Sequence, residues 1–178
     1  MFSSWRKFCS LFLGLTLFAF NYSSSALTND ADVEAAFIFN VVKYTDWPNE
    51  TLPKDANLVL CYVGESSPLG SSIAELNGKQ INLHTLEVHT TTRLSNLGSC
   101  HVIVLGQSSD VHSLQKNIAP FALIIGEGET FVDAGGGVGL FSVGNHIRFD
   151  INLSSTSANG LKVSVNLLRL ARNVRGNQ

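Results

Sequence analysis

The sequence predicts an α/β domain in which helices flank a mixed sheet of about six strands, with a parallel core and a C-terminal antiparallel hairpin. Three short, continuously apolar runs end at or near a glycine, a pattern typical of strands buried on both faces of a parallel sheet. Short helical segments separate these runs, as crossovers between parallel strands require. Two later segments are joined by Gly-Asn, which favours a tight hairpin turn.

The first 26 residues have the three parts of a secretory signal. Arg6 and Lys7 form the positive start, residues 11–20 are apolar, and small residues follow. The apolar run is shorter than the ~20 residues that cross a bilayer. We therefore expect a cleaved signal peptide over residues 1–26 and one domain over residues 27–178, exported to the periplasm and not embedded in a membrane.

Charge and cysteine usage narrow the classes of function. Without Arg6 and Lys7, the 12 basic residues fall to 10 against 14 acidic residues, a net charge of −4. This charge argues against nucleic-acid binding, which depends on neutralising phosphates. Cys61 and Cys100 are the two cysteines of the expected domain. In an oxidising compartment such a pair is expected to form a disulfide.

Residues 30–44 predict a helix with acidic residues in its first turn, where the helix dipole favours them. Trp47-Pro48 follows its end, since the residue before proline avoids the helical region. One stripe at helical spacing comprises Val33, Ala36, Phe37, Asn40, Val41 and Tyr44. Further apolar residues lie off this stripe, namely Ala35, Ile38, Phe39 and Val42. A helix that is apolar almost all round must be covered on more than one side, by its own domain or by a second chain.

The remaining elements follow in order along the chain. We expect buried strands over residues 58–63, 100–105 and 121–125, a half-buried or edge strand over 80–89, and short helices over 67–76 and 110–118. A helical turn over 129–133 precedes the hairpin strands 138–143 and 146–153. A long amphipathic helix, capped by one of Ser154 to Ser157, is expected to reach about Val174, with Leu161, Val165, Leu168 and Ala171 on one stripe.

The glycine-rich residues 126–139 do not match a phosphate-binding loop. They precede a strand, lack Gly-Lys-Ser/Thr and include acidic residues that repel an anion, so turns and a bulge are expected. Ser142 follows Leu140-Phe141, which lacks the first glycine of the Gly-x-Ser-x-Gly nucleophile motif. Neither segment therefore predicts a catalytic nucleophile.

The residue types and spacings in the sequence do not support a metal site or an acid–base site either. Cys100 and His101 are adjacent in an expected strand, so their side chains point to opposite faces and cannot easily converge on one ion. Arg148 and Asp150 share one strand face, where ion pairs with neighbouring groups are expected. The sequence therefore predicts no catalytic residue, no metal site and no cofactor.

Several blocks between residues 32 and 171 carry a family resemblance. They are Ala36–Pro48, Leu60–Gly64, Gly78-Lys79, Cys100–Val102, Arg148–Asn152, Gly160–Ser164 and Leu167–Ala171. Together they resemble the YfiR-like family of periplasmic proteins, with the helix running into Lys-Tyr-Thr-Asp-Trp-Pro as the clearest signature. Residues 136–141 depart from the family, which more often has a Met-Ile-Asn-like segment after the glycines.

The resemblance implies a regulator that is not an enzyme. Family members of the YfiR type bind the periplasmic sensor domain of an inner-membrane diguanylate cyclase and hold it inactive, which lowers cyclic di-GMP signalling and biofilm formation. The resemblance also implies an outer-membrane lipoprotein as a further partner, a homodimer and redox-sensitive cysteines. Such an inhibitor must bind one conformation of its target better than another.

The over-apolar helix supplies candidate partner-binding residues. They are Phe37, Ile38, Phe39, Tyr44 and Trp47, each of which belongs either to the core or to an interface. A second hypothesis is a small-molecule sensor, because open parallel sheets bind ligands at the carboxyl ends of their strands, where Gly64, Gly106 and Gly126 lie. An enzyme with an unfamiliar site is the third hypothesis, which a cleft with converging Asp, His or Ser side chains would support.

Overall fold

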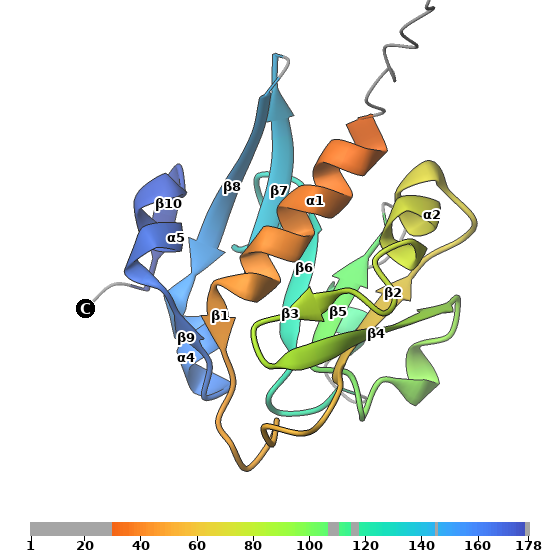
Figure 1. Ribbon diagram of the computed structural model, residues 1–178. Helices are drawn as coiled ribbons and strands as arrows, with labels where there is room; N and C mark the ends of the chain where they lie inside the picture. Colours follow the sequence, from red (N-terminus) through yellow and green to blue (C-terminus); the bar gives the residue numbers. More distant parts are fainter. Residues whose placement is uncertain (1–29, 107–110, 115–117, 145, 177–178) are drawn as a thin grey trace, which may run out of the picture.

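The computed structural model describes residues 30–106, 111–114, 118–144 and 146–176 (Figure 1). The expected signal peptide, residues 1–26, lies outside the described residues. The helices are α1 (Asp30–Lys43), α2 (Pro68–Ala74), the 3-10 helix η1 (Leu94–Asn96), α3 (Val111–Leu114), α4 (Leu153–Ala158) and α5 (Val165–Leu170). The strands are β1 (Thr45–Asp46), β2 (Leu58–Val63), β3 (Gln80–Ile81), β4 (His84–Thr91), β5 (Val102–Leu105), β6 (Leu123–Glu127), β7 (Val138–Val143), β8 (His146–Asn152), β9 (Lys162–Val163) and β10 (Asn173–Arg175).

An eight-stranded mixed sheet forms the centre of the domain, in the order β10-β8-β7-β6-β5-β2-β4-β3. Strands β4, β2, β5, β6 and β7 run parallel to one another, and β8 is antiparallel to β7. The short strands β3 and β10 occupy the two edges, and β1 pairs with β9 in a separate two-stranded sheet. The predicted fold class, a parallel core with a C-terminal antiparallel hairpin, is confirmed.

Each face of the sheet packs against its own hydrophobic cluster. One cluster joins α1 and α2 to side chains such as Leu60 and Val104, and α1 crosses this face in Figure 1. The other cluster lies on the opposite face and joins α3 to Ile103, Leu105 and Phe131. Neighbouring residues of β5 therefore belong to opposite clusters, which is why this strand is apolar at every position.

The predicted strand over residues 80–89 is two strands. β3 and β4 pair antiparallel, with Gln80 opposite Thr85, around the turn at Asn82 and Leu83. Asn82 has a φ of 52°, a left-handed conformation that Asn tolerates better than most residues. The alternation of apolar and polar residues continues through the turn, so periodicity does not reveal it.

The long C-terminal helix predicted from Ser154 to Val174 is wrong. Asn152 caps α4, and α5 is a separate helix capped by Ser164. Between them Gly160 adopts a φ of 74°, a left-handed conformation typical of a helix end, and β9 follows. Of the predicted stripe, Leu161 is buried but Val165 is 62% exposed, because the chain changes direction between these residues.

Within the described part of the chain, no helix combines the length and the apolar character that a bilayer crossing needs.

Candidate functional site

Helix α1 packs on the sheet through a face other than the predicted stripe. Its buried residues are Ala31, Ala35, Ile38, Val41 and Val42, of which the stripe contained Val41 alone. The stripe does not mark the buried face because both faces are apolar at helical spacing, and it includes Asn40, whose amide costs free energy to bury. Asn40 is instead exposed, and its side chain donates a hydrogen bond to the Ala36 carbonyl.

Most of the candidate partner-binding residues contribute to packing. Ile38 is fully buried and is a core residue, and Phe39 is half-buried against the same cluster. Phe37 makes an edge-to-face contact with Phe149, with ring centroids 5.0 Å apart. The Trp47 indole N–H donates to a backbone carbonyl, that of Phe121, at 3.1 Å, which connects the end of α1 to the segment before β6.

Tyr44 is 40% exposed, more than the other four candidates. Val33 lies on the same outer side of α1 and is 43% exposed, although it is not among the partner-binding residues predicted from the sequence. The Tyr44 carbonyl accepts a hydrogen bond from Ser164 N–H, so the next residue, Val165, lies close to this end of α1. We refer to Val33, Phe37, Tyr44 and Val165 as the α1 surface.

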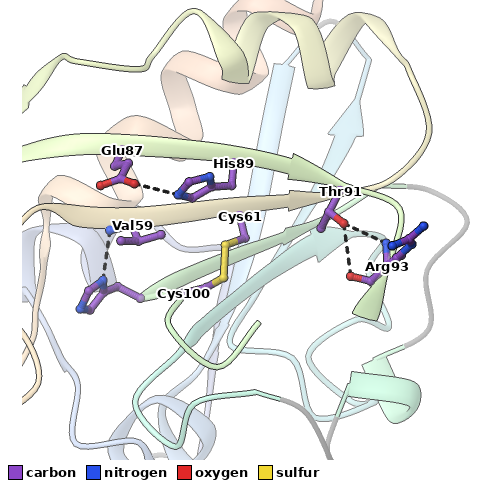
Figure 2. Close-up of a disulfide and its surroundings, with 8 residues drawn as sticks. Val59, Cys61, Glu87, His89, Thr91, Arg93 and Cys100 are labelled. Carbon is purple, nitrogen blue, oxygen red and sulfur yellow. Dashed lines mark hydrogen bonds and ion pairs between the residues drawn. A yellow bond between two sulfur atoms is a disulfide. The ribbon is translucent and has the colours of Figure 1, made fainter. Parts of the chain in front are cut away.

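Cys61 and Cys100 form a disulfide with a Cα–Cα distance of 5.9 Å, as the sequence suggests (Figure 2). The bond connects β2 to the turn before β5, two strands that also pair directly in the sheet. Both cysteines are buried in the cluster that contains α3, with 3% and 0% exposure. The disulfide therefore fixes the centre of the sheet from its second face.

His101, next to Cys100, has a structural role. Its Nδ1 accepts a hydrogen bond from Val59 N–H at 3.0 Å, and its Nε2–H donates to the Thr51 carbonyl at 3.1 Å. Burial of the ring lowers the pKa of His101, which favours this neutral form. No group of three or more potential metal-ligating residues exists within the described ranges.

The glycine-rich segment holds one aromatic ring. Residues 129–135 form successive turns, and Gly128 and Gly135 adopt φ values of 108° and 99°. Phe131 is 8% exposed, and its ring lies against both Gly126 and Gly136, where a Cβ atom would overlap the ring. The glycines thus make room for a core aromatic side chain.

Asp150 pairs with Arg172, a residue beyond its own strand, while Arg148 is exposed. The Arg172 guanidinium donates to both Asp150 carboxylate oxygens, at 3.0 and 2.6 Å, and to Glu129 at 2.6 Å. The hydrogen bonds that Arg172 donates to Asp150, and next the one that it donates to Glu129, raise the pKa of Arg172 above its usual range. The arginine also stacks 4.0 Å above the Phe141 ring. Because these contacts attach β10 to β8, the cluster is structural.

A crevice lies at the carboxyl ends of the parallel strands. After β2 the chain passes through α2 on the α1 face to reach β4, whereas α3, which follows β5, belongs to the opposite face. From β2 the sheet therefore continues to β4 on one side, and from β5 it continues to β6 on the other. The boundary between β2 and β5 is the topological switch point, at which open α/β sheets bind ligands. Two adjoining cavities of about 450 and 410 Å³ open here and share Glu34, Gly106 and Glu127 among their lining residues. We refer to these two cavities together as the switch-point crevice.

Glu34 and Glu127 come together in this crevice from different elements, α1 and the end of β6. Burial, and secondly repulsion from Glu127, raises the pKa of Glu34 to about 7. Neither residue is among the sites predicted from the sequence. The available signals were an acidic residue beyond the first turn of an apolar helix and another that lies two residues after the predicted buried strand 121–125.

Replacement of Glu34 by glutamine is expected to stabilise the protein in a pH-dependent way. Because the folded-state pKa is raised from 4.5 to about 7, the native state binds more protons than the unfolded state between these values, and stability falls as pH rises. With allowance for solvent screening of this half-buried group, E34Q should gain about 1–2 kcal/mol at pH 8. The gain should vanish at pH 4, and urea unfolding at both pH values measures it. An equal gain at both pH values would contradict the assignment.

A sequence model of one protein family, described as YfiR/HmsC-like, matches residues 31–172. None of the curated proteins matches the chain. Among solved structures, the crystal structure of a conserved domain protein from Vibrio cholerae O1 biovar El Tor strain N16961 is similar, with a TM-score of 0.49 and 12% sequence identity. That similarity covers 82% of this chain and 60% of the other, so this chain spans less than two thirds of that protein.

The YfiR-like family consists of periplasmic regulators and is not catalytic, and the buried disulfide is consistent with an oxidising compartment. The match extends from the first turn of α1 to the residue before β10, which is nearly the whole described domain. The chain therefore belongs to the YfiR/HmsC-like family.

Proposed function

We propose that this protein represses an inner-membrane diguanylate cyclase by binding the periplasmic sensor domain of that enzyme. Family membership is the observation that carries the proposal, because the YfiR-like family suggests a periplasmic regulator of diguanylate cyclases. Repression lowers the cyclic di-GMP concentration and with it biofilm formation. An outer-membrane lipoprotein that relieves repression and a homodimer of the protein belong to the same proposal.

The α1 surface is the contact that we propose for the cyclase. Val33, Tyr44 and Val165 are 43%, 40% and 62% exposed, although their side chains are apolar or aromatic. The buried side of α1 is fixed on the sheet by Ile38, Val41 and Val42. A rigid helix that presents apolar side chains loses little conformational entropy on binding, which favours its use as a contact surface.

Repression requires that the protein bind the inactive conformation of the cyclase more tightly than the active one. Binding of equal strength to both conformations shifts no equilibrium. A tenfold preference corresponds to about 1.4 kcal/mol, the size of a few favourable side-chain contacts.

Charged substitutions on the α1 surface test this contact. V33D and Y44D place a carboxylate on the proposed contact without changing the core. L83D is the control, because it places a carboxylate outside this contact, at a 71% exposed residue of the β3–β4 turn. In affinity capture from detergent-solubilised native membranes, the wild type and L83D should retain a diguanylate cyclase identified by mass spectrometry. V33D and Y44D should each retain about tenfold less. Equal capture by all four proteins, or no cyclase with the wild type, would contradict the proposal.

A further inference from the structure

The switch-point crevice has the size and the lining of a small-molecule site. Its two cavities, about 450 and 410 Å³, lie within the usual range for ligand pockets. In the first cavity Leu140 and Ile147 lie on the sheet face that α1 covers, and Ser142 supplies a hydroxyl group. Backbone of Gly106 and Gly128 completes the lining, so a ligand can approach the main chain closely.

The charges in the crevice select the sign of a ligand. The acidic side chains among the lining residues are Asp30, Glu34, Glu65 and Glu127, and none of the described residues that line the two cavities is basic. Within the described part of the chain, neither Glu34 nor Glu127 has a hydrogen-bond or salt-bridge partner. Every fully buried side-chain nitrogen or oxygen atom of the described residues has a partner, so the carboxylate oxygens of Glu34 and Glu127 are open to the crevice. A cation that enters the crevice would pair with both carboxylates.

We propose that the switch-point crevice binds a small organic cation, with its ammonium group between the carboxylates of Glu34 and Glu127 and its apolar part against Leu140 and Ile147. The crevice lies at the carboxyl ends of the strands, and none of the described residues that line its two cavities belongs to the α1 surface. The site therefore goes beyond the proposed function and does not depend on it.

The lining favours an organic cation over a metal ion. The four carboxylates come from α1, the loop after β2 and the end of β6, and no cluster of three potential ligating residues exists within the described ranges, whereas Ca²⁺ takes six or more oxygen ligands. An apolar wall formed by Leu140 and Ile147 contributes nothing to a hydrated metal ion, whereas it can cover a hydrocarbon chain or ring. A primary ammonium with an apolar body satisfies both parts of the lining.

Binding at this site is coupled to proton release. The pKa of Glu34 is about 7, so at pH 7 about half of the Glu34 carboxyls carry a proton that an ammonium group would displace. The groups that face Glu34 are Asp30 on its own helix, Tyr62 of β2, Glu65 of the following loop and Glu127 of β6, and the lining residues from β7 and β8 carry no titratable group. A cation should therefore bind more tightly at pH 8 than at pH 5.5.

The test is isothermal titration calorimetry on the mature chain with three probes: 2-phenylethylammonium, 1,5-diaminopentane and agmatine. At pH 8 at least one probe should bind with a dissociation constant below ~1 mM, and binding should be about tenfold weaker at pH 5.5. At pH 7, titrations in buffers of different ionisation enthalpy should show release of about half a proton per bound probe. The neutral analogue 2-phenylethanol should not bind.

Glu34→Gln and Glu127→Gln should each weaken binding by about tenfold, and Glu34→Gln should also abolish proton release. Glu75→Gln, at the exposed C-terminal end of α2 and outside both cavities, is the matched control and should bind as the wild type does. Glutamine is close in shape to the protonated Glu34, so the fold should persist, and circular dichroism checks it. If no probe binds below ~10 mM at pH 8, if 2-phenylethanol binds equally well, or if both crevice variants bind as the wild type does, the proposal is overturned.

Discussion

Phe131→Ala is expected to lower the free energy of unfolding by about 3–5 kcal/mol, the range for removal of a buried aromatic ring. Gly126→Ala should cost about 2–3 kcal/mol, because the added Cβ overlaps the Phe131 ring. The Phe131 ring cannot move away from the added Cβ atom freely, because its other edge already lies against Gly136. Chemical denaturation of each variant measures these losses.

The same contact predicts that the two substitutions are not additive. In the Phe131→Ala background the added Cβ of Gly126→Ala enters the space left by the ring, so its cost should fall below about 0.5 kcal/mol. Gly98→Ala is the matched control, because a Cβ at Gly98 meets no atom within 4 Å. A cost for Gly126→Ala that is the same in both backgrounds would show that the ring does not occupy this position.

Loss of the Cys61–Cys100 disulfide is expected to lower the free energy of unfolding by about 3–4 kcal/mol. The two cysteines are separated by 39 residues, and closing a loop of this length restricts the unfolded chain by about that amount. The native state loses little, because β2 and β5 remain paired through backbone hydrogen bonds from Leu60 to Val63. The variant with alanine at both positions measures the effect without leaving buried thiols.

Urea unfolding of the oxidised wild type and of the double-alanine variant makes the comparison. Dithiothreitol should lower the midpoint of the wild type towards that of the variant and should leave the variant unchanged. Equal midpoints for the wild type with and without reductant would contradict a stabilising disulfide.

The parallel core could be predicted because its signals are local. β2 has the predicted bounds, Leu58–Val63, since a strand buried on both faces is apolar at every position. The β7–β8 hairpin was also predicted, because Gly144-Asn145 interrupts two strand-like segments. In these cases a few adjacent residues determine the local structure, and no distant partner is needed.

Other features depend on contacts that periodicity does not encode. The direction in which α1 faces was not predicted, because apolar residues surround the helix and only the sheet selects Ala35, Ile38 and Val42. The break at Asn159-Gly160 carried a turn signal that the apparent stripe outweighed, although Gly160 with a positive φ ends the preceding helix. Glu34 and Glu127 meet only because α1 crosses the carboxyl end of β6, so their shared site follows from the tertiary fold.

The intracellular concentration of cyclic di-GMP tests the central claim most directly. We expect it to rise several-fold when the gene is deleted from its host and to return to the original level when the wild-type protein is restored. V33D and Y44D should fail to restore it, whereas L83D should succeed. An unchanged cyclic di-GMP concentration in the deletion strain, under oxidising and reducing growth conditions alike, would contradict a repressor of a diguanylate cyclase.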